Sequence, residues 1–221
     1  MIKIALVDDQ DMIRFGLRAI LSTYESFDVA VEAGDGLAAI QAMEASPVDV
    51  VLMDIRMPGI DGVETTRRLR QRWNGDELKI VVLTTFEHDE TVLAALRAGA
   101  NGYLSKSAGP RELVAAIEEV LGGGGALSAA AAAALIGRVA NEPDHPIDEQ
   151  LVERFAALTP RELDVTRAIA AGSDVNTIAH TLFLSPYTVK THANRAMAKV
   201  GARDRAQLVA FAFSAGVRPV R

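Results

Sequence analysis

The sequence of 221 residues contains no cysteine, which excludes disulfide scaffolds, thiolate metal sites and cysteine nucleophiles. Aromatic residues are scarce, at 5%, so the core must consist mainly of Ala, Val, Leu and Ile. No apolar run approaches the ~18 residues that a membrane-spanning helix needs. The short apolar start at residues 4–7 ends at Asp8-Asp9, which a secretory signal does not tolerate. We therefore expect a cytoplasmic protein without a membrane partner.

Charge is divided unequally along the chain. The whole sequence has 23 basic and 29 acidic residues, a net charge of −6. Residues 151–221 contain ten Lys and Arg against five Asp and Glu, a net of +5, which leaves −11 for residues 1–150. An acidic larger part joined to a basic smaller part indicates two domains with different partners, the basic one binding nucleic acid. Chance asymmetry would explain the charge alone equally well.

Composition marks the boundary between these parts. Residues 122–125 are four glycines, a flexible segment without side chains to pack. The alanine-rich residues 129–139 predict one short helix, and the prolines that follow it break that helix. The sequence thus predicts a first domain at residues 1–121, a linker with a short helix at residues 122–150, and a second domain at residues 151–221.

The first 121 residues alternate between strand and helix patterns. Five short apolar runs are typical of strands buried on both faces, with segments of helical period after each of them. These runs are residues 2–7, 27–31, 48–53, 79–83 and 102–104. The alternation predicts a doubly wound parallel sheet, in which functional groups gather outside the carboxyl ends of the strands.

Charged and polar residues stand at those ends. Asp8 and Asp9 follow the first run, Asp54 follows the third, Thr84 the fourth, and Lys106 comes shortly after the fifth. In the strand order 2-1-3-4-5 the first and third strands are neighbours, so three carboxylates would share one crevice. Such like charges repel without a cation, and oxygen ligands suit Mg²⁺. A single Asp after a strand is more often a helix N-cap, but capping does not explain three.

This constellation resembles the receiver domain of two-component response regulators, over residues 1–121. The residues that match in order are Asp8-Asp9, Asp54, Met57-Pro58-Gly59, Asp61-Gly62, Leu83-Thr84, Gly99-Ala100 and Tyr103 to Lys106. The resemblance implies an α/β flavodoxin-like fold with a five-stranded parallel sheet of order 2-1-3-4-5. It also implies that Asp54 accepts a phosphoryl group from a phosphohistidine on a sensor histidine kinase.

The same resemblance implies a role for each residue around Asp54. Asp9, Asp54 and the backbone carbonyl of Arg56 would hold Mg²⁺, with Asp8 acting through water. Thr84 and Lys106 would bind the phosphoryl oxygens. Tyr103 would be a switch residue that fills the space vacated by the Thr84 hydroxyl, although an ordinary strand aromatic is the alternative. The chain would then not be an enzyme, and it would assist only its own Mg²⁺-dependent phosphorylation and dephosphorylation.

The second domain has the pattern of a helix-turn-helix. Thr159, Pro160 and Glu162 form a capping box that opens one helix. A short helix at residues 175–181 and a turn follow, and Ser185 then caps a third helix. A short helix, a tight turn and a capped helix in this order are typical of DNA-reading domains.

The third helix has one apolar stripe and one polar, cationic face. The stripe consists of Val189, Ala193, Ala196, Met197 and Val200. The opposite face suits base edges and phosphates, although a merely solvated surface would look the same.

Residues 158–217 resemble the LuxR/NarL-type four-helix output domain. The matching residues are Leu158 to Glu162, Ile178-Ala179, Leu184-Ser185, Thr188 to His192, Lys199-Val200-Gly201 and Arg203-Asp204-Arg205. The resemblance implies that Lys190, Thr191 and Asn194 face base edges. The resemblance also implies phosphate contacts, or a role in orienting the helix, for Tyr187, Thr188, His192, Arg195 and Lys199. The last helix, residues 205–214, would supply a dimer contact. Val175 and Thr177 depart from the family, which usually has asparagine and glutamate there.

Together these patterns predict a DNA-binding response regulator of a two-component system. Phosphorylation would control its homodimerisation and its binding to two half-sites of double-stranded promoter DNA, and so regulate transcription. Two other functions stay open. One is a Mg²⁺-dependent phosphohydrolase, for which the sequence offers no second catalytic acid; the other is a signalling adaptor whose second domain binds protein.

Overall fold

The computed structural model describes residues 1–85, 90–122, 126–127 and 147–217. The chain divides into two compact units, Met1–Ala126 and Leu127–Arg221. The short helix expected at residues 129–139 lies outside the described residues. None of the helices in the described ranges has the length and hydrophobicity of a membrane span.

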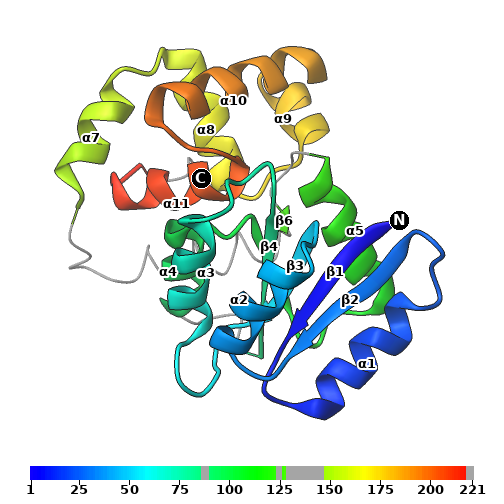
Figure 1. Ribbon diagram of the computed structural model, residues 1–221. Coiled ribbons are helices and arrows are strands. Elements are labelled where there is room, and N and C mark those ends of the chain that lie inside the picture. Colours follow the sequence, from blue (N-terminus) through cyan, green and yellow to red (C-terminus); the bar gives the residue numbers. More distant parts are fainter. Residues whose placement is uncertain (86–89, 123–125, 128–146, 218–221) are drawn as a thin grey trace. The chain divides into compact units, whose positions relative to one another are not determined.

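The first unit is a parallel sheet with helices on both faces (Figure 1). Its strands are β1 Ile2–Val7, β2 Phe27–Ala33, β3 Val50–Asp54, β4 Lys79–Thr84 and β5 Gly102–Ser105, and the short strand β6 Ala126–Leu127 spans the boundary between the two units. Its helices are α1 Asp11–Leu21, α2 Gly36–Ala45, α3 Gly62–Arg70, α4 Glu90–Ala98 and α5 Pro110–Leu121. The sheet order is β2-β1-β3-β4-β5-β6, which confirms the predicted order of the first five strands.

The two-residue strand β6 lies within the segment that the sequence predicts as linker. It hydrogen-bonds at the β5 edge of the sheet. Two residues are too few to show the alternation that marks a strand, and the preceding glycines point to a flexible segment. Only pairing with β5 makes this segment a strand.

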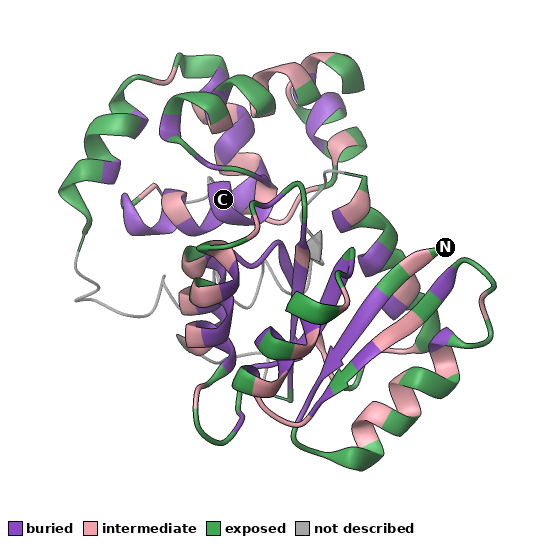
Figure 2. Ribbon diagram, viewed as in Figure 1, coloured by how far each residue is buried: buried purple, intermediate pink, exposed green. Residues whose placement is uncertain are grey.

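The core lies on both sides of the central strands. All five residues of β3 are buried (Figure 2), as expected for a strand flanked on both edges and covered on both faces. On one face α1 and α5 contribute Leu21, Leu113 and Ile117 to the cluster that contains Leu52 of β3. On the other face α3 packs against α2 and α4.

The N-terminus of α3 lies directly against the end of β3. Asp61 caps this helix, and its carboxylate accepts a hydrogen bond from the Glu64 N–H at 2.8 Å. A Cβ atom on Gly62 would lie 2.4 Å from the carbonyl oxygen of Asp54, so only glycine permits this approach. The Asp61-Gly62 pair therefore fixes the loop that follows Asp54.

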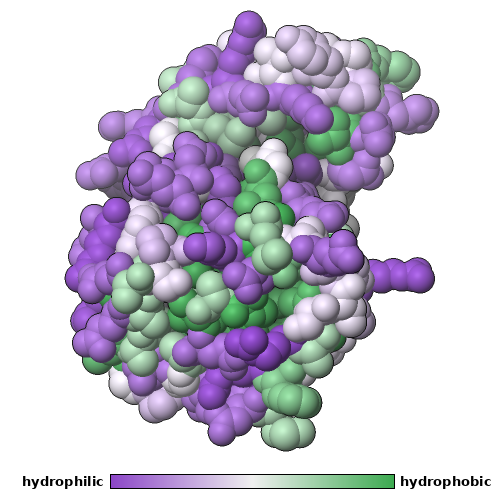
Figure 3. All heavy atoms as spheres, turned by 45° about the vertical axis from the view of Figure 1, so that its right-hand side comes forward, coloured by the Kyte–Doolittle hydropathy of each residue, from purple (hydrophilic) through white to green (hydrophobic). Residues whose placement is uncertain are grey.

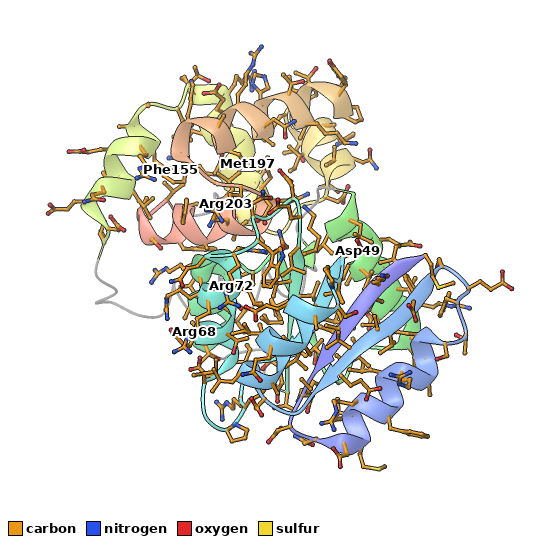
Figure 4. All side chains as sticks on the ribbon, in the orientation of Figure 1. Asp49, Arg68, Arg72, Phe155, Met197 and Arg203 are labelled. Carbon is orange, nitrogen blue, oxygen red and sulfur yellow. The ribbon has the colours of Figure 1, made fainter. Side chains whose placement is uncertain are left out.

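The second unit is helical. Its helices are α7 Glu149–Ala156, α8 Pro160–Ala170, α9 Val175–Thr181, α10 Pro186–Val200 and α11 Arg205–Ser214. The sequence predicts α8 to α11 but not α7, because the polar residues 148–150 indicate the end of the linker. The Asp148 carboxylate caps α7, and Phe155 is buried on the side of α7 that packs against α10 (Figure 4). A capped helix commonly has polar residues in its first turn, so the polarity of residues 148–150 is also consistent with the start of a helix.

Candidate functional site

The predicted acidic residues meet at the carboxyl edge of the sheet. Asp8 and Asp9 follow β1 directly, and Asp54 is the last residue of the neighbouring strand β3. One carboxylate oxygen from each of these residues lies within 4.8 Å of the other two. The structure therefore brings the three carboxylates into one cluster, which we call the acidic crevice.

Lys106 joins two of these carboxylates. Its Nζ lies 2.7 Å from Oδ2 of Asp8 and 2.8 Å from Oδ2 of Asp54. Asp8 is fully buried and Asp54 is 4% exposed, whereas Asp9 is exposed. Two carboxylates and the ammonium thus form a buried ionic group, and Asp9 lies on its solvent side.

The position of Asp8 depends on neighbours in α1. Its Oδ1 accepts a hydrogen bond from the Gln10 N–H at 3.0 Å, and the Arg14 guanidinium donates to its backbone carbonyl. Arg14 carries no sequence signal of this contact, because a single arginine on a helix looks like an ordinary surface cation. Its contact with Asp8 makes it a positioning residue of the acidic crevice.

Burial and charge act in opposite directions on the groups in the crevice. Burial raises the pKa of the Asp54 carboxyl above its usual value, and the charge of Asp8 adds to this. Hydrogen bonds from Lys106 and from the Arg56 backbone oppose the rise in the pKa of Asp54 only in part. Burial alone would lower the pKa of Lys106, but the hydrogen bonds and charges of Asp54 and Asp8 together raise it. Lys106 is therefore a cation at neutral pH.

The donor set of the crevice suits a magnesium ion. Its ligands would be carboxylate oxygens, the hard donors that Mg²⁺ prefers. Ionisation of Asp8, Asp9 and Asp54 beside the Lys106 ammonium leaves two uncompensated negative charges, which a divalent cation neutralises. Arg56, whose carbonyl the resemblance assigns to the metal, lies in the loop two residues beyond Asp54.

Thr84 and Tyr103 lie on the two strands next to β3. Thr84 is the buried last residue of β4, beside Ser105 of β5, and its carbonyl accepts a hydrogen bond from the Lys106 N–H at 2.7 Å. Tyr103 pairs with Val82, two residues before Thr84, and is buried. Thr84 therefore stands at the edge that carries Asp54, and Tyr103 lies deeper in the sheet.

The polar face of α10 presents the residues expected at base edges. Lys190 and Asn194 are exposed, and Tyr187 is 80% exposed on the same side of the helix. Thr191 is half-buried, and its hydroxyl donates to the Tyr187 carbonyl at 3.0 Å. With 3.6 residues per turn, positions 187, 190, 191 and 194 share one face, opposite the buried Val189 and Ala196.

The flanking candidates on α10 have more varied surroundings. Arg195 is exposed, and the Thr188 hydroxyl lies 2.8 Å from the Ser185 hydroxyl at the helix cap. His192 is half-buried, and its Nδ1 has no hydrogen-bond partner among the described residues. Lys199 instead bonds within the unit: its Nζ lies 2.7 Å from Oε2 of Glu162.

Glu162 connects the start of α8 to the end of α10. Its carboxylate accepts the Thr159 N–H in the capping box, and the Lys199 ammonium pairs with the same oxygen. The hydrogen bond from Lys199, aided by the Thr159 backbone, lowers the pKa of Glu162 to about 2. The Lys199 Nζ also donates to the Ala157 carbonyl at 3.2 Å. Lys199 thus positions α10 within the helical unit.

Glu162→Gln is expected to destabilise the helical unit by about 1–2 kcal/mol at neutral pH. The Lys199 ammonium loses its carboxylate partner and can bond only to an uncharged amide oxygen, and the partial exposure of Lys199 reduces the loss. Because the folded-state pKa of Glu162 is lowered, its contribution is complete above pH 4.5 and disappears as the pH falls toward about 2. Circular dichroism of the full chain during thermal unfolding measures this, with the exposed Glu153→Gln as control. An equal loss at pH 2.5 and pH 7 would contradict the ionic origin.

Exposed hydrophobic residues are the main feature that the sequence analysis missed. Met12 and Phe15 of α1 are 81% and 70% exposed, and green spheres at the lower edge of Figure 3 show hydrophobic side chains at the surface of this unit. Phe183, in the turn before α10, is 95% exposed. Apolar periodicity predicts such residues to be buried, so only the tertiary structure shows which apolar residues are exposed instead.

Two family models match the chain. A response regulator receiver domain matches residues 4–118, and the luxR family of bacterial regulatory proteins matches residues 156–212. The chain belongs to the LuxR-type response regulators of two-component systems. It is a DNA-binding regulator of transcription, as the sequence predicts, and typical members with such a DNA-binding domain are not catalytic enzymes.

Relatives of this response regulator cover nearly its whole length. It is 38% identical over 216 residues to the uncharacterized transcriptional regulatory protein YxjL of Bacillus subtilis, covering 98% of this chain and 97% of that protein. It is 36% identical to the response regulator UvrY of Escherichia coli K12, covering 98% and 96%. The crystal structure of ChrA, from a heme-sensing two-component system, is 34% identical with a TM-score of 0.54, covering 96% of both chains. RcsB of Salmonella enterica bound to a promoter shares the fold, at 24% identity and a TM-score of 0.55, covering 96% and 98%.

Proposed function

We propose that Asp54 accepts a phosphoryl group from a phosphohistidine of a sensor histidine kinase, with Mg²⁺ held by Asp8, Asp9, Asp54 and the Arg56 carbonyl. The observation that carries the proposal is the buried contact of Lys106 with both Asp8 and Asp54, beside the exposed Asp9. The fixed Lys106 ammonium and a divalent cation would neutralise the negative charge around the acceptor, which allows an anionic group to be transferred to it.

The transfer exchanges one bond to phosphorus for another. The P–N bond to the donor histidine breaks and its electron pair stays on the imidazole nitrogen, while a P–O bond forms to the Asp54 carboxylate. When bound, Mg²⁺ neutralises charge on the carboxylates and on the transferring oxygens. The Lys106 ammonium and the Thr84 hydroxyl then bind phosphoryl oxygens. Beyond its own phosphorylation, the chain would catalyse only the hydrolysis of the acyl phosphate, in which water attacks phosphorus, inorganic phosphate leaves and the Asp54 carboxylate is restored.

Phosphorylation would control the regulator through a local change of charge. The new group adds roughly −1.5 to −2 charge beside Thr84. A movement of the Thr84 hydroxyl toward the new oxygens would leave space for the Tyr103 ring and bias the unit between two states. The changed surface favours a homodimer, in which α11 supplies a contact in the helical unit. One RcsB structure, of two RcsB dimers bound to two parallel DNAs, supports a DNA-bound homodimer by analogy of fold.

In the dimer, two copies of α10 would read two half-sites of promoter DNA, about 10 bp apart. Lys190, Thr191 and Asn194 are proposed to face base edges, since they share the exposed face of the helix. The set proposed for phosphate contacts is Tyr187, Thr188, His192 and Arg195. Lys199 contributes by fixing α10 through Glu162. We further propose that the regulator acts in the cytoplasm, where both kinase and promoter are accessible.

Mapping the phosphorylated residue tests the proposal directly. Incubation of the full chain with acetyl phosphate and MgCl₂ is expected to add one phosphoryl group, lost on treatment with hydroxylamine as an acyl phosphate should be. Peptide mass spectrometry after trapping should place the modification on Asp54, and chelation of Mg²⁺ should prevent it. A stable modification on a hydroxyl residue, or labelling that is insensitive to chelation, would contradict the proposed site.

A further inference from the structure

Phe183 has an unusual backbone conformation in the turn between α9 and α10. Its φ is +54°, and it is the sole residue other than glycine with positive φ in the described parts of the chain. Side chains bulkier than Asn or Asp rarely adopt this left-handed region, because their Cβ atom crowds the backbone. Its ring is also 95% exposed, so packing within the chain does not compensate for the strained conformation.

The hydrogen bonds of this turn do not require a phenylalanine. The Leu184 N–H donates to the Ala179 carbonyl at 2.8 Å, and the Phe183 N–H to the His180 carbonyl at 3.4 Å. These bonds form the helix-ending arrangement whose left-handed position glycine usually occupies. Glycine would make the same bonds with less strain and would expose no apolar ring. The backbone of this turn therefore gives no reason for a phenylalanine at this position.

The ring stands at the end of α10 that a helix-turn-helix brings closest to the bases. Phe183 comes two residues before the cap Ser185, and the exposed Tyr187 follows within the first turn of α10. On α10, the exposed Arg195 suits a phosphate beside the groove, and the exposed Lys190 is proposed to face a base edge. In the major groove, the apolar group that a phenylalanine ring can contact is the C5-methyl of thymine.

We infer that Phe183 reads the methyl group of one thymine in each half-site. This inference rests on the proposed reading of DNA by α10 and adds a residue and a base preference to it. The strained turn has a function in this reading, because it projects the ring beyond the helix. Specificity at this thymine comes from burial of its methyl against the ring, without a hydrogen bond.

Deoxyuridine substitution tests this contact, because deoxyuridine lacks only the methyl group of thymidine. The probe is a duplex selected by the full-length phosphorylated chain from a random-sequence library, with each thymine replaced in turn. At one thymine in each half-site, replacement by deoxyuridine should weaken binding of the wild-type chain about four-fold. This is the loss expected when one methyl group is no longer there to be buried. Phe183→Gly should bind the parent duplex about ten-fold more weakly and show no loss at that thymine.

Two controls separate contact from folding. Phe183→Gly should raise the thermal midpoint of the helical unit by about 3–6 °C, because it relieves the strained turn, so weaker binding would not reflect unfolding. Phe15→Ala removes another exposed ring, on α1, and should leave DNA binding unchanged.

Three outcomes would overturn the inference. Phe183→Gly could bind as tightly as the wild-type chain. It could keep the deoxyuridine sensitivity while Tyr187→Ala loses it, which would assign the methyl contact to Tyr187. Sensitivity could also be absent at every thymine. A wild-type chain that selects no duplex would instead contradict the proposed reading of DNA itself, and this inference with it.

Discussion

Asp54→Asn is expected to abolish phosphorylation by acetyl phosphate completely. The amide lacks the charged oxygen that forms the P–O bond, and no nearby carboxylate replaces it, since Asp8 is buried against Lys106 and Asp9 is placed to bind the metal. Phosphorylation-dependent dimerisation and tighter DNA binding should be lost with it. Radiolabelling with acetyl phosphate and MgCl₂ measures phosphorylation, and size-exclusion chromatography under the same conditions measures dimerisation.

The same variant should be more stable than the wild-type chain in Mg²⁺-free buffer at neutral pH. Burial raises the folded-state pKa of Asp54, so the ionised carboxylate is less favourable in the folded chain than in the unfolded chain. The stability difference should be smallest below pH 3.8, where the carboxyl is protonated in both states, and should grow as the pH rises through the folded-state pKa. Trp73, the single tryptophan, lies in the receiver unit and reports its unfolding by fluorescence.

A matched control for this experiment is Asp28→Asn, which changes an exposed aspartate on β2. It should leave both labelling and the pH dependence unchanged. Undiminished labelling of Asp54→Asn would place the acceptor elsewhere. A variant that is less stable than wild type in the absence of Mg²⁺ would show that the Lys106 contact outweighs the burial of Asp54.

Lys106→Ala is expected to destabilise the receiver unit by about 3–5 kcal/mol in Mg²⁺-free buffer. Its removal leaves the buried carboxylates of Asp8 and Asp54 without their cation, and breaking a buried ion pair from one side is costly for this reason. Added Mg²⁺ should recover part of this loss, because it neutralises the same charges and binds only the folded crevice. Urea unfolding followed by Trp73 fluorescence, with MgCl₂ or with EDTA, measures both.

The exposed Lys3→Ala serves as the control for loss of a lysine and should change stability little. Lys106→Ala should also lose the switch, since phosphorylated Asp54 then lacks the cation that binds its oxygens, even where some labelling persists. Wild-type stability of Lys106→Ala without Mg²⁺ would mean that the crevice carboxylates are protonated or solvated, against the buried arrangement described above.

Positions at strand ends made the crevice predictable from the sequence. Parallel strands place their carboxyl ends at one edge, so Asp8, Asp54 and Thr84 had to lie near one another once the strand order was known. The capping residues Thr159 and Ser185 likewise marked the starts of α8 and α10, because a cap acts on backbone groups only three residues away. Such local rules need no knowledge of distant contacts.

Other features depend on contacts between residues far apart in the chain. A lysine on a polar helix face looks the same in sequence whether it meets phosphate or a buried carboxylate, and only the packing of α10 on α8 brings Lys199 to Glu162. The strand β6 exists only through its pairing with β5. Burial also depends on neighbours, which is why the exposed ring of Phe183 could not be foreseen.

The sequence by itself determined the alternating α/β unit, the capped helix-turn-helix and the residues that stand at each functional edge, whereas the order of the strands came from the family resemblance. Periodicity, capping and strand ends are short-range properties of a chain, and they were sufficient for this. The tertiary structure alone decided that Lys106 neutralises Asp8 and Asp54, that Lys199 stays within the fold, and that Phe183 projects into solvent. Each of these depends on which side chains and how much water surround a group, and long-range packing sets both.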